Sequence, residues 1–255
     1  MPKNLITPDR YDAVLLDMDG VITDTASIHA SCWKTMFDEY LQKWATRHSV
    51  PFRPFEVATD YKVYVDGKPR YAGVRDFLKS RGIVLPEGKP TDPPSAETVC
   101  GLGNRKNDLV ERYLASAGVE AFPGSVAFIK YLRKVGIKTA VVTSSQNCQA
   151  VLRAAKIEDL FDARVDGHVL IQYRLAGKPA PDSYLKAAEM LSVIAERAVV
   201  IEDAISGVRA GAAGKFGLVI GVDRKGDADE LRASGADIVV RDLAQLIDYK
   251  TTKVA

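Results

Sequence analysis

The fold is decided by the stretch Val14-Leu15-Leu16-Asp17-Met18-Asp19-Gly20-Val21-Ile22-Thr23-Asp24-Thr25. A short apolar run that stops on two carboxylates predicts a buried strand with acids at its exposed carboxyl end. Because side chains alternate along a strand, Asp17 and Asp19 can lie on one side of its tip. Gly20 then allows a sharp turn away from the sheet. An ordinary acidic turn would look similar, but the arrangement also suits a carboxylate nucleophile with a second acid that moves protons.

Residues beyond Pro123-Gly124 alternate between predicted helices and strands. The later strands are expected at 138–143, about 161–165, 198–201, 218–222 and 237–240. Helices are expected at about 125–135, 147–155, 182–191, 205–211, 227–234 and 243–248. This alternation predicts the α/β class, with a doubly wound parallel sheet of the Rossmann-like kind. Functional sites of such sheets lie beyond the carboxyl ends of the strands.

Residues 25–122 differ from the rest because they contain no convincing buried strand. Apolar residues at helical spacing predict a helix over about 26–42, followed by an irregular stretch rich in proline and aromatic residues over 46–71. Further helices are expected at about 73–80 and 104–117. We therefore predict a mostly helical cap domain at 25–122, inserted into a core domain formed by 1–24 and 123–255.

Two of the later strands also end in residues suited to phosphate chemistry. The strand at 138–143 is followed by hydroxyl and amide side chains at a predicted helix start, where free backbone N–H groups bind phosphate. These residues are Thr143, Ser144, Ser145, Gln146 and Asn147. A helix N-cap would need only one of them. Glu202 and Asp203 end the strand at 198–201, and acids gathered at one edge would repel unless a cation such as Mg²⁺ lay among them.

Lys178 lies in the loop Gly177-Lys178-Pro179-Ala180-Pro181-Asp182, ahead of a predicted helix. A lone lysine is usually solvated. At this place, however, its charge could balance both a carboxylate nucleophile and a phosphate.

Taken in order, four motifs resemble those of the haloacid dehalogenase-like (HAD) superfamily. They are Asp-x-Asp-Gly-Val-Ile-x-Asp-Thr from Asp17, Thr-Ser-Ser from Thr143, Gly-Lys-Pro-x-Pro-Asp from Gly177, and Glu-Asp-x-x-x-Gly from Glu202. The first match extends through Ala26, His29 and Trp33 and is similar to the β-phosphoglucomutase group.

The resemblance implies a role for each matching residue. It implies Asp17 as the nucleophile and Asp19 as the general acid and base. Thr143, the backbone at Ser144, and Lys178 would hold the transferring phosphoryl group. The Mg²⁺ ligands would be Asp17, the carbonyl of Asp19, Glu202 and Asp203. Thr25 and His29 would lie at the cap hinge and help to position Asp19.

The cap must decide the substrate, because the core motifs are shared by phosphatases and mutases. A mutase needs a second anion site that holds a distant phosphate. Arg70, in Gly67-Lys68-Pro69-Arg70, resembles the cap arginine that binds this phosphate in the mutase group, and Lys106 could line the same cleft. On the core side, Ser145 and Asn147 match distal-phosphate contacts. Gln146 departs from the group, whose best-known members carry a lysine there, so one positive charge is missing.

Three functions remain open from the sequence. The first is a mutase that interconverts β-D-glucose 1-phosphate and glucose 6-phosphate through an aspartyl-phosphate enzyme and a glucose 1,6-bisphosphate intermediate. The second is a Mg²⁺-dependent sugar-phosphate phosphatase, acting for example on trehalose 6-phosphate or a hexose phosphate. The third is a phosphosugar-binding protein without activity, which is disfavoured because every catalytic position of the motifs is present.

Composition limits the classes of partner. The 255 residues are 47% hydrophobic and 27% charged, as in a globular enzyme, and the net charge of +2 gives no nucleic-acid footprint. No apolar run approaches the roughly 20 residues that span a bilayer, and residues 1–10 lack the apolar region of a secretory signal. Three scattered cysteines fit neither disulfides nor a C-x-x-C pair. We therefore expect a cytoplasmic protein. The resemblance implies a small sugar phosphate as its partner, and we expect a monomer.

Overall fold

The computed structural model describes residues 5–247 and divides the chain into two compact units. The first, here called the core, comprises Met1–Asp24 and Val119–Ala255, and the second, the cap, comprises Thr25–Gly118. The sequence placed the return to the core at 122–123. The four intervening residues pair with the chain that leaves β1: Asp24 N–H donates to Glu120 O at 3.0 Å and Phe122 N–H to Ile22 O at 2.9 Å.

The core is built on a six-stranded sheet in the order β3-β2-β1-β4-β5-β6, and every pairing is parallel. The strands are β1 (Ala13–Leu16), β2 (Lys138–Val142), β3 (Ala163–Val165), β4 (Ala198–Glu202), β5 (Leu218–Val222) and β6 (Ile238–Val240). Strand order reverses beside β1, which is the position where such sheets place their sites. Leu16 pairs with Val141 of β2 and Ile201 of β4, so these three strands end level. The predicted doubly wound α/β fold is confirmed.

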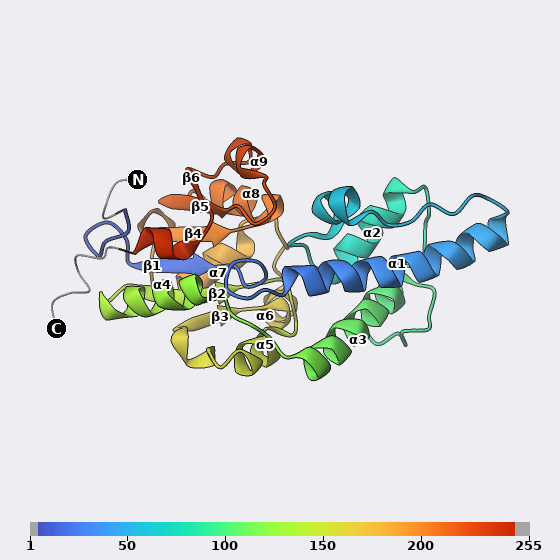
Figure 1. The fold of residues 1–255 in the computed structure, drawn as a ribbon, viewed down its shortest axis with the longest axis horizontal. Coiled ribbons are helices and arrows are strands. Elements are labelled where there is room, and N and C mark those ends of the chain that lie inside the picture. The colour runs from blue at the N-terminus through green and yellow to red at the C-terminus, as the bar shows by residue number, and fades with distance from the viewer. Residues whose placement is uncertain (1–4, 248–255) are drawn as a thin grey trace. The chain divides into compact units, whose positions relative to one another are not determined.

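Helices cover both faces of the sheet, since all four residues of β1 are buried (Figure 1). They are α4 (Pro123–Lys134), α5 (Cys148–Ala154), α6 (Gly167–Tyr173), α7 (Asp182–Met190), α8 (Ile205–Ala213) and α9 (Ala228–Ala233). Short 3₁₀ turns lie at Glu158–Leu160, Ala195–Arg197 and Leu243–Leu246. Helices α7 and α8 pack on the face that carries Ala13 and Leu15.

Two segments of the core differ from the sequence prediction. Helix α6 was not expected; the side chain of Asp166 caps it by accepting hydrogen bonds from the N–H groups of His168 and Val169. The last predicted helix, at 243–248, is a 3₁₀ turn over Leu243–Leu246, with a capping box formed by Asp242 and Gln245. Asp248 lies outside the described residues.

The cap contains helices α1 (Ala26–His48), α2 (Arg70–Ser80) and α3 (Val99–Ala117) and a π-helix, η1 (Val57–Val65). Its centre is aromatic: Phe37 stacks on Trp33 at 5.3 Å and on Phe55 at 5.2 Å, and its ring centroid lies 4.2 Å from that of Phe77. These side chains are fully or almost fully buried. The cap therefore has a hydrophobic core of its own.

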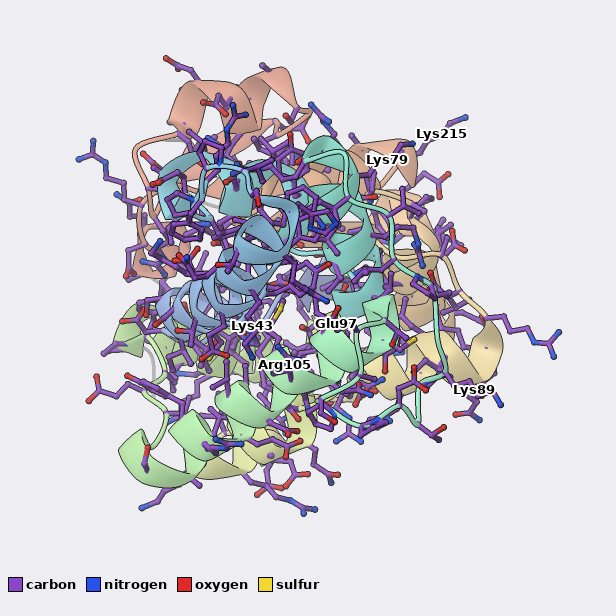
Figure 2. All side chains as sticks on the ribbon, turned by 90° about the vertical axis from the view of Figure 1, so that its right-hand side faces the viewer. Lys43, Lys79, Lys89, Glu97, Arg105 and Lys215 are labelled. Atoms are coloured by element: carbon purple, nitrogen blue, oxygen red, sulfur yellow. The ribbon has the colours of Figure 1, made fainter. Side chains whose placement is uncertain are left out.

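The cap's long connections are fastened to its helices. Arg81, the residue directly after α2, donates to the Asp60 carboxylate in η1 at 2.7 Å and to Pro54 O at 3.1 Å. Arg105 of α3 donates from Nε to Pro94 O at 2.8 Å, and Arg47 of α1 pairs with Glu97 at 2.9 Å (Arg105 and Glu97 are labelled in Figure 2). These contacts fix chain that lacks regular pairing of its own. Within residues 5–247, the helices are too short or too polar to cross a membrane.

Candidate active site

Asp17 and Asp19 follow β1 at the edge of the sheet where β2 and β4 also end. Asp17 extends the strand pairing, because its N–H donates to Ile201 O at 2.9 Å. The chain then closes into a compact turn in which Ile22 and Thr23 both donate to Met18 O at 2.9 Å. Gly20 adopts a φ of +88°, a conformation that favours glycine. Two acids are thus fixed one residue apart.

Lys178 joins the ends of two strands through a single ammonium group. Its Nζ donates to Asp17 Oδ1 and to Glu202 Oε1, each at 2.5 Å, and lies 3.3 Å from Val142 O. The Lys178 side chain is only 1% exposed. A buried lysine held by two carboxylates supplies a fixed positive charge beside Asp17.

Burial dominates the electrostatics of this group. It raises the pKa of the Asp17 carboxyl well above its usual range, and the neighbouring Glu202 carboxylate raises it further, while Lys178 opposes both. For Lys178, burial favours the neutral amine, but Asp17 and Glu202 outweigh it and raise the lysine pKa, so the ammonium stays charged. Two carboxylates share this one ammonium, and that excess of negative charge favours a further cation.

Glu202 is engaged through both of its oxygens. Besides Lys178, Oε1 accepts a hydrogen bond from the Tyr184 hydroxyl at 2.8 Å, and Oε2 accepts one from Ala204 N–H at 3.1 Å. Burial, then the Glu202 charge, raises the pKa of the Tyr184 phenol, so it remains a donor. Gly207 allows this packing, since a Cβ there would lie 1.8 Å from Glu202 Oε1. Glu202 therefore orients Lys178, in addition to its predicted place among metal ligands.

The loop after β2 is shaped by its own hydroxyl groups. Thr143 Oγ1 accepts Ser145 N–H at 3.1 Å, and Ser145 Oγ accepts Asn147 N–H at 3.1 Å. The Thr143 hydroxyl also donates to Asp19 Oδ2 at 3.4 Å. Ser144 and Gln146 are partly buried in the same loop. Its close packing requires Gly167, where a Cβ would lie 2.8 Å from both Ser144 O and Gln146 Cγ.

Carboxylate oxygens of Asp17, Glu202 and Asp203 lie within 4.8 Å of one another, and all three residues are buried. Asp203 Oδ2 also forms an ion pair with Lys225 Nζ at 3.6 Å. Hard oxygen donors are those that Mg²⁺ prefers. The donor set therefore fits a magnesium ion, and the backbone carbonyl of Asp19 remains the predicted further ligand.

In the cap, the structure brings together two of the predicted substrate residues. Lys106 Nζ of α3 lies 2.6 Å from His29 Nδ1 of α1, and it also lies 5.0 Å from the ring centroid of Trp33. Lys106 is 7% exposed and His29 is partly buried. Thr25, directly before α1, is buried and accepts His29 N–H through its carbonyl at 3.0 Å. The Lys106 side chain is thus buried within the cap, against His29 and the Trp33 ring.

Arg70 is the first residue of α2 and lies against the adjacent Tyr71, with its guanidinium carbon 5.9 Å from the ring centroid. Burial lowers the pKa of Arg70. Tyr71 is fixed in turn by a hydrogen bond to Asn104 Oδ1 at 2.9 Å. Lys68, two residues earlier, is engaged by Asp76 at 2.8 Å and Val63 O at 3.3 Å. These contacts hold the turn that presents Arg70.

Tyr184 is a site residue that sequence reasoning missed. It lies in the first turn of α7, two residues after the Asp182 that ends the lysine loop, and it is fully buried. In a sequence, a tyrosine within a predicted helix is normally interpreted as a residue that packs in the hydrophobic core. The only feature of the sequence that pointed to Tyr184 was its position, about one helical turn after Pro181 in the loop that carries Lys178.

A family model described as haloacid dehalogenase-like hydrolase matches residues 11–215, which is most of the chain. The chain belongs to the haloacid dehalogenase-like hydrolase family. With its buried carboxylates and lysine at the tips of β1 and β4, it is an enzyme of the phosphotransferase or hydrolase type.

Individual proteins that resemble this chain include both mutases and phosphatases. A protein of Mycobacterium bovis named beta-phosphoglucomutase is 50% identical over 243 residues, covering 94% of this chain and 93% of its own. Hexitol phosphatase A of Escherichia coli is 30% identical over 239 residues, covering 93% and 94%. The crystal structure of beta-phosphoglucomutase from Clostridium difficile has a TM-score of 0.71 at 22% identity, covering 95% and 96%. The last comparison shows a shared fold.

Proposed function

We propose that the protein is a Mg²⁺-dependent phosphosugar mutase that interconverts β-D-glucose 1-phosphate and glucose 6-phosphate through an aspartyl-phosphate enzyme and a β-glucose 1,6-bisphosphate intermediate. The observation that carries the proposal is the 50% identity, over almost the whole chain, to the Mycobacterium bovis relative named beta-phosphoglucomutase. The site supports it, because Asp17 and Lys178 have the burial and contacts of a nucleophile and its counter-charge.

Each residue of the core then has a task. Asp17 attacks phosphorus, while Lys178 holds the nucleophile in place and balances the phosphoryl oxygens. Thr143 and the backbone at Ser144 bind those oxygens, and Asp19 gives a proton to the leaving sugar oxygen and later removes one from the attacking hydroxyl. When bound by Asp17, the Asp19 carbonyl, Glu202 and Asp203, Mg²⁺ would neutralise part of the charge on the transferring group.

A mutase must also bind the second phosphate of its bisphosphate. We assign this role to Arg70 and Lys106 of the cap and to Ser145, Gln146 and Asn147 of the core. Arg70 has the bidentate donor geometry that phosphate recognition uses. Gln146 can donate hydrogen bonds but carries no charge, so the distal phosphate depends more heavily on the cap arginine.

A sugar-phosphate phosphatase is the second candidate. It is favoured by the 30% identity to Hexitol phosphatase A over nearly the full length of both chains. The two activities share the attack by Asp17 and differ in whether water or a sugar hydroxyl receives the phosphoryl group.

One experiment separates them. The purified protein is given β-glucose 1-phosphate, Mg²⁺ and a trace of β-glucose 1,6-bisphosphate, and glucose 6-phosphate and free phosphate are followed together. Glucose 6-phosphate with little free phosphate supports the mutase. Stoichiometric phosphate release would overturn it in favour of the phosphatase. Asp17→Asn, which keeps the shape of the side chain, should abolish either activity while leaving the circular-dichroism spectrum unchanged.

Arg70→Ala tests the distal-phosphate assignment separately. Loss of a desolvated charged contact costs about 2 kcal/mol or more, so mutase kcat/KM should fall at least about 30-fold. Arg105→Ala is the matched control, because Arg105 also belongs to the cap but contacts the Pro94 carbonyl through Nε. An Arg70→Ala enzyme with near wild-type mutase activity would rule out this distal site.

The state of the three cysteines is relevant to the cellular compartment of the protein. Cys32, Cys100 and Cys148 are free and buried, which fits the cytoplasm, where disulfides are rare. We further propose a monomer whose substrate is a small sugar phosphate.

A further inference from the structure

The loop that follows β5 carries two adjacent cations to two different parts of the site. Asp223 closes this loop, since its Oδ1 accepts the N–H groups of Gly226 at 2.7 Å and Asp227 at 3.0 Å. From the loop, Arg224 reaches the carbonyl of Gly20, while Lys225 pairs with Asp203. None of the four sequence motifs includes this segment.

Arg224 is held on three sides. Its Nε donates to Gly20 O at 2.8 Å, and Nη1 donates to Arg241 O at 3.1 Å. The guanidinium carbon lies 3.8 Å from the ring centroid of Phe122, the distance of a stacked arginine. The remaining nitrogen, Nη2, is buried with no hydrogen-bond partner among the described residues. A buried hydrogen-bond donor without an acceptor lowers the stability of the folded protein. A contribution to stability alone therefore does not explain why an arginine occupies this position.

The peptide that Arg224 holds lies at a sensitive point. Gly20 directly follows Asp19, and a Cβ on Gly20 would lie 2.2 Å from Asp203 Oδ2. The same arginine covers Phe122, whose N–H donates to Ile22 O at 2.9 Å. One side chain thus fixes both the turn that carries Asp19 and the returning chain that pairs with this turn. A small displacement of the Gly20 peptide would move the Asp19 carboxylate.

We propose that Arg224 is a positioning residue that holds Asp19 where it can give its proton to the leaving oxygen. This rests on the proposed role of Asp19 as general acid. In that step the bond from the Asp17 oxygen to phosphorus forms, the bond from phosphorus to the sugar oxygen breaks, and the sugar oxygen takes the proton of Asp19. When acetyl phosphate is the donor, acetate leaves as an anion and needs no proton.

The two kinds of donor therefore provide the test. Formation of the phosphoryl-enzyme is measured by rapid quench with Mg²⁺, using β-glucose 1,6-bisphosphate or glucose 6-phosphate in one series and acetyl phosphate in the other. Arg224→Ala should slow transfer from the sugar phosphates at least about 20-fold and transfer from acetyl phosphate less than about threefold, since a positioned acid supplies roughly 10²- to 10⁴-fold. Arg224→Lys can still donate to Gly20 O and should recover part of the loss.

Arg232→Ala is the matched control, because Arg232 lies in the neighbouring α9 and pairs with the fully exposed Asp229. It should leave both rates unchanged. If Arg224→Ala does not fold, Phe122→Leu removes the stacked ring instead and should show the same selective loss in milder form. Equal losses with both donors would mean a general structural role and would overturn the proposal. Unchanged rates with both donors would overturn it as well.

This outcome is separate from that of the proposed mutase. A wild-type enzyme that only hydrolyses sugar phosphates would refute the mutase, yet its two donor rates would still reveal whether Arg224 acts through Asp19.

Discussion

Lys178 Nζ lies 2.5 Å from Asp17 Oδ1, and both side chains are buried. The lysine comes from the loop before α7 and the aspartate from the tip of β1, 161 residues apart in the chain. Such a pair is costly to desolvate and costly to break, because removal of one partner strands the other charge. The pair therefore links the stability of the core directly to the chemistry of the site.

Lys178→Met should abolish phosphoryl transfer and destabilise the core. Removal of one partner of a buried ion pair costs about 3–5 kcal/mol, here with two carboxylates left behind. Added Mg²⁺ should recover part of the stability, because a cation can compensate the stranded carboxylates, but it should not restore activity. Urea unfolding with and without Mg²⁺ measures the effect. Lys134→Ala, an exposed lysine that ends α4, is the control and should be neutral.

Tyr184→Phe should lower activity without removing it. The ring would keep its packing, but Glu202 Oε1 would lose the hydrogen bond from the Tyr184 hydroxyl and keep the one from Lys178 Nζ. A hydrogen bond to a charged group contributes about 1.5–3 kcal/mol, so the unfolding free energy should fall by an amount in that range. Thermal unfolding and kcat are the readouts. Full stability and activity in this variant would show that Tyr184 is only a packing residue.

Gly20→Ala should damage the site more than its backbone strain explains. The new Cβ would meet Asp203 Oδ2 at 2.2 Å, and the φ of +88° is unfavourable for alanine. Gly136→Ala is a matched control, since Gly136 has a φ of +81° and open space around it. Both variants should lose about 1 kcal/mol through backbone strain. Gly20→Ala alone should also weaken Mg²⁺ binding, measured by calorimetry. Equal behaviour of the two variants would contradict the close packing around Asp203.

The three thiols should be inert in the native protein. Burial raises the pKa of Cys32, Cys100 and Cys148, so little thiolate exists near neutral pH. Iodoacetamide followed by mass spectrometry should show no labelling of the folded protein and three labels after denaturation. Rapid native labelling at any of the three would show that its helix opens readily.

The pair Asp12–Arg197 should make a pH-dependent contribution to stability. Arg197 donates to both carboxylate oxygens of Asp12, at 2.5 and 2.7 Å. The hydrogen bond from Arg197 lowers the pKa of Asp12 below its ordinary value of 3.8. A lowered folded-state pKa gives stability that is fully present above 3.8 and is lost as the pH falls through the folded value.

Asp12→Asn isolates this charge. The variant should melt below the wild type at neutral pH, and the difference should vanish in stronger acid, where Asp12 is protonated as well. Thermal unfolding over a pH series measures it, with Asp229→Asn as the control because that partner of Arg232 is fully exposed. A difference that stayed constant down to the acid limit would mean that shape, and not charge, sets the contribution.

The sheet and the edge where it carries chemistry were predictable because both depend on local patterns. Apolar runs such as Ala13–Leu16 are buried on both faces, and parallel strands end at a common edge, so acids that follow β1 and β4 meet there. The structure does bring Asp17, Lys178 and Glu202 within hydrogen-bond distance. Their catalytic roles, and those of the cap residues, stay predictions.

What the sequence could not show depends on contacts between distant residues. The π-helix Val57–Val65 was expected to be irregular, and it is fastened by the bond between Arg81 and Asp60, 21 residues apart. Tyr184 and Arg224 donate hydrogen bonds to the Glu202 carboxylate and to the Gly20 carbonyl, contacts that no local pattern reveals. Helix α6 was missed because its side-chain cap, Asp166, looks like a loop residue in the sequence.

The aromatic centre of the cap has a practical consequence. Trp33 and Trp44 are the two tryptophans of the sequence, and both belong to Thr25–Gly118. Intrinsic tryptophan emission of the unlabelled protein therefore reports on the cap alone, whereas far-ultraviolet dichroism reports on both units. Comparing the two signals during denaturation would reveal whether cap and core melt together or in separate steps.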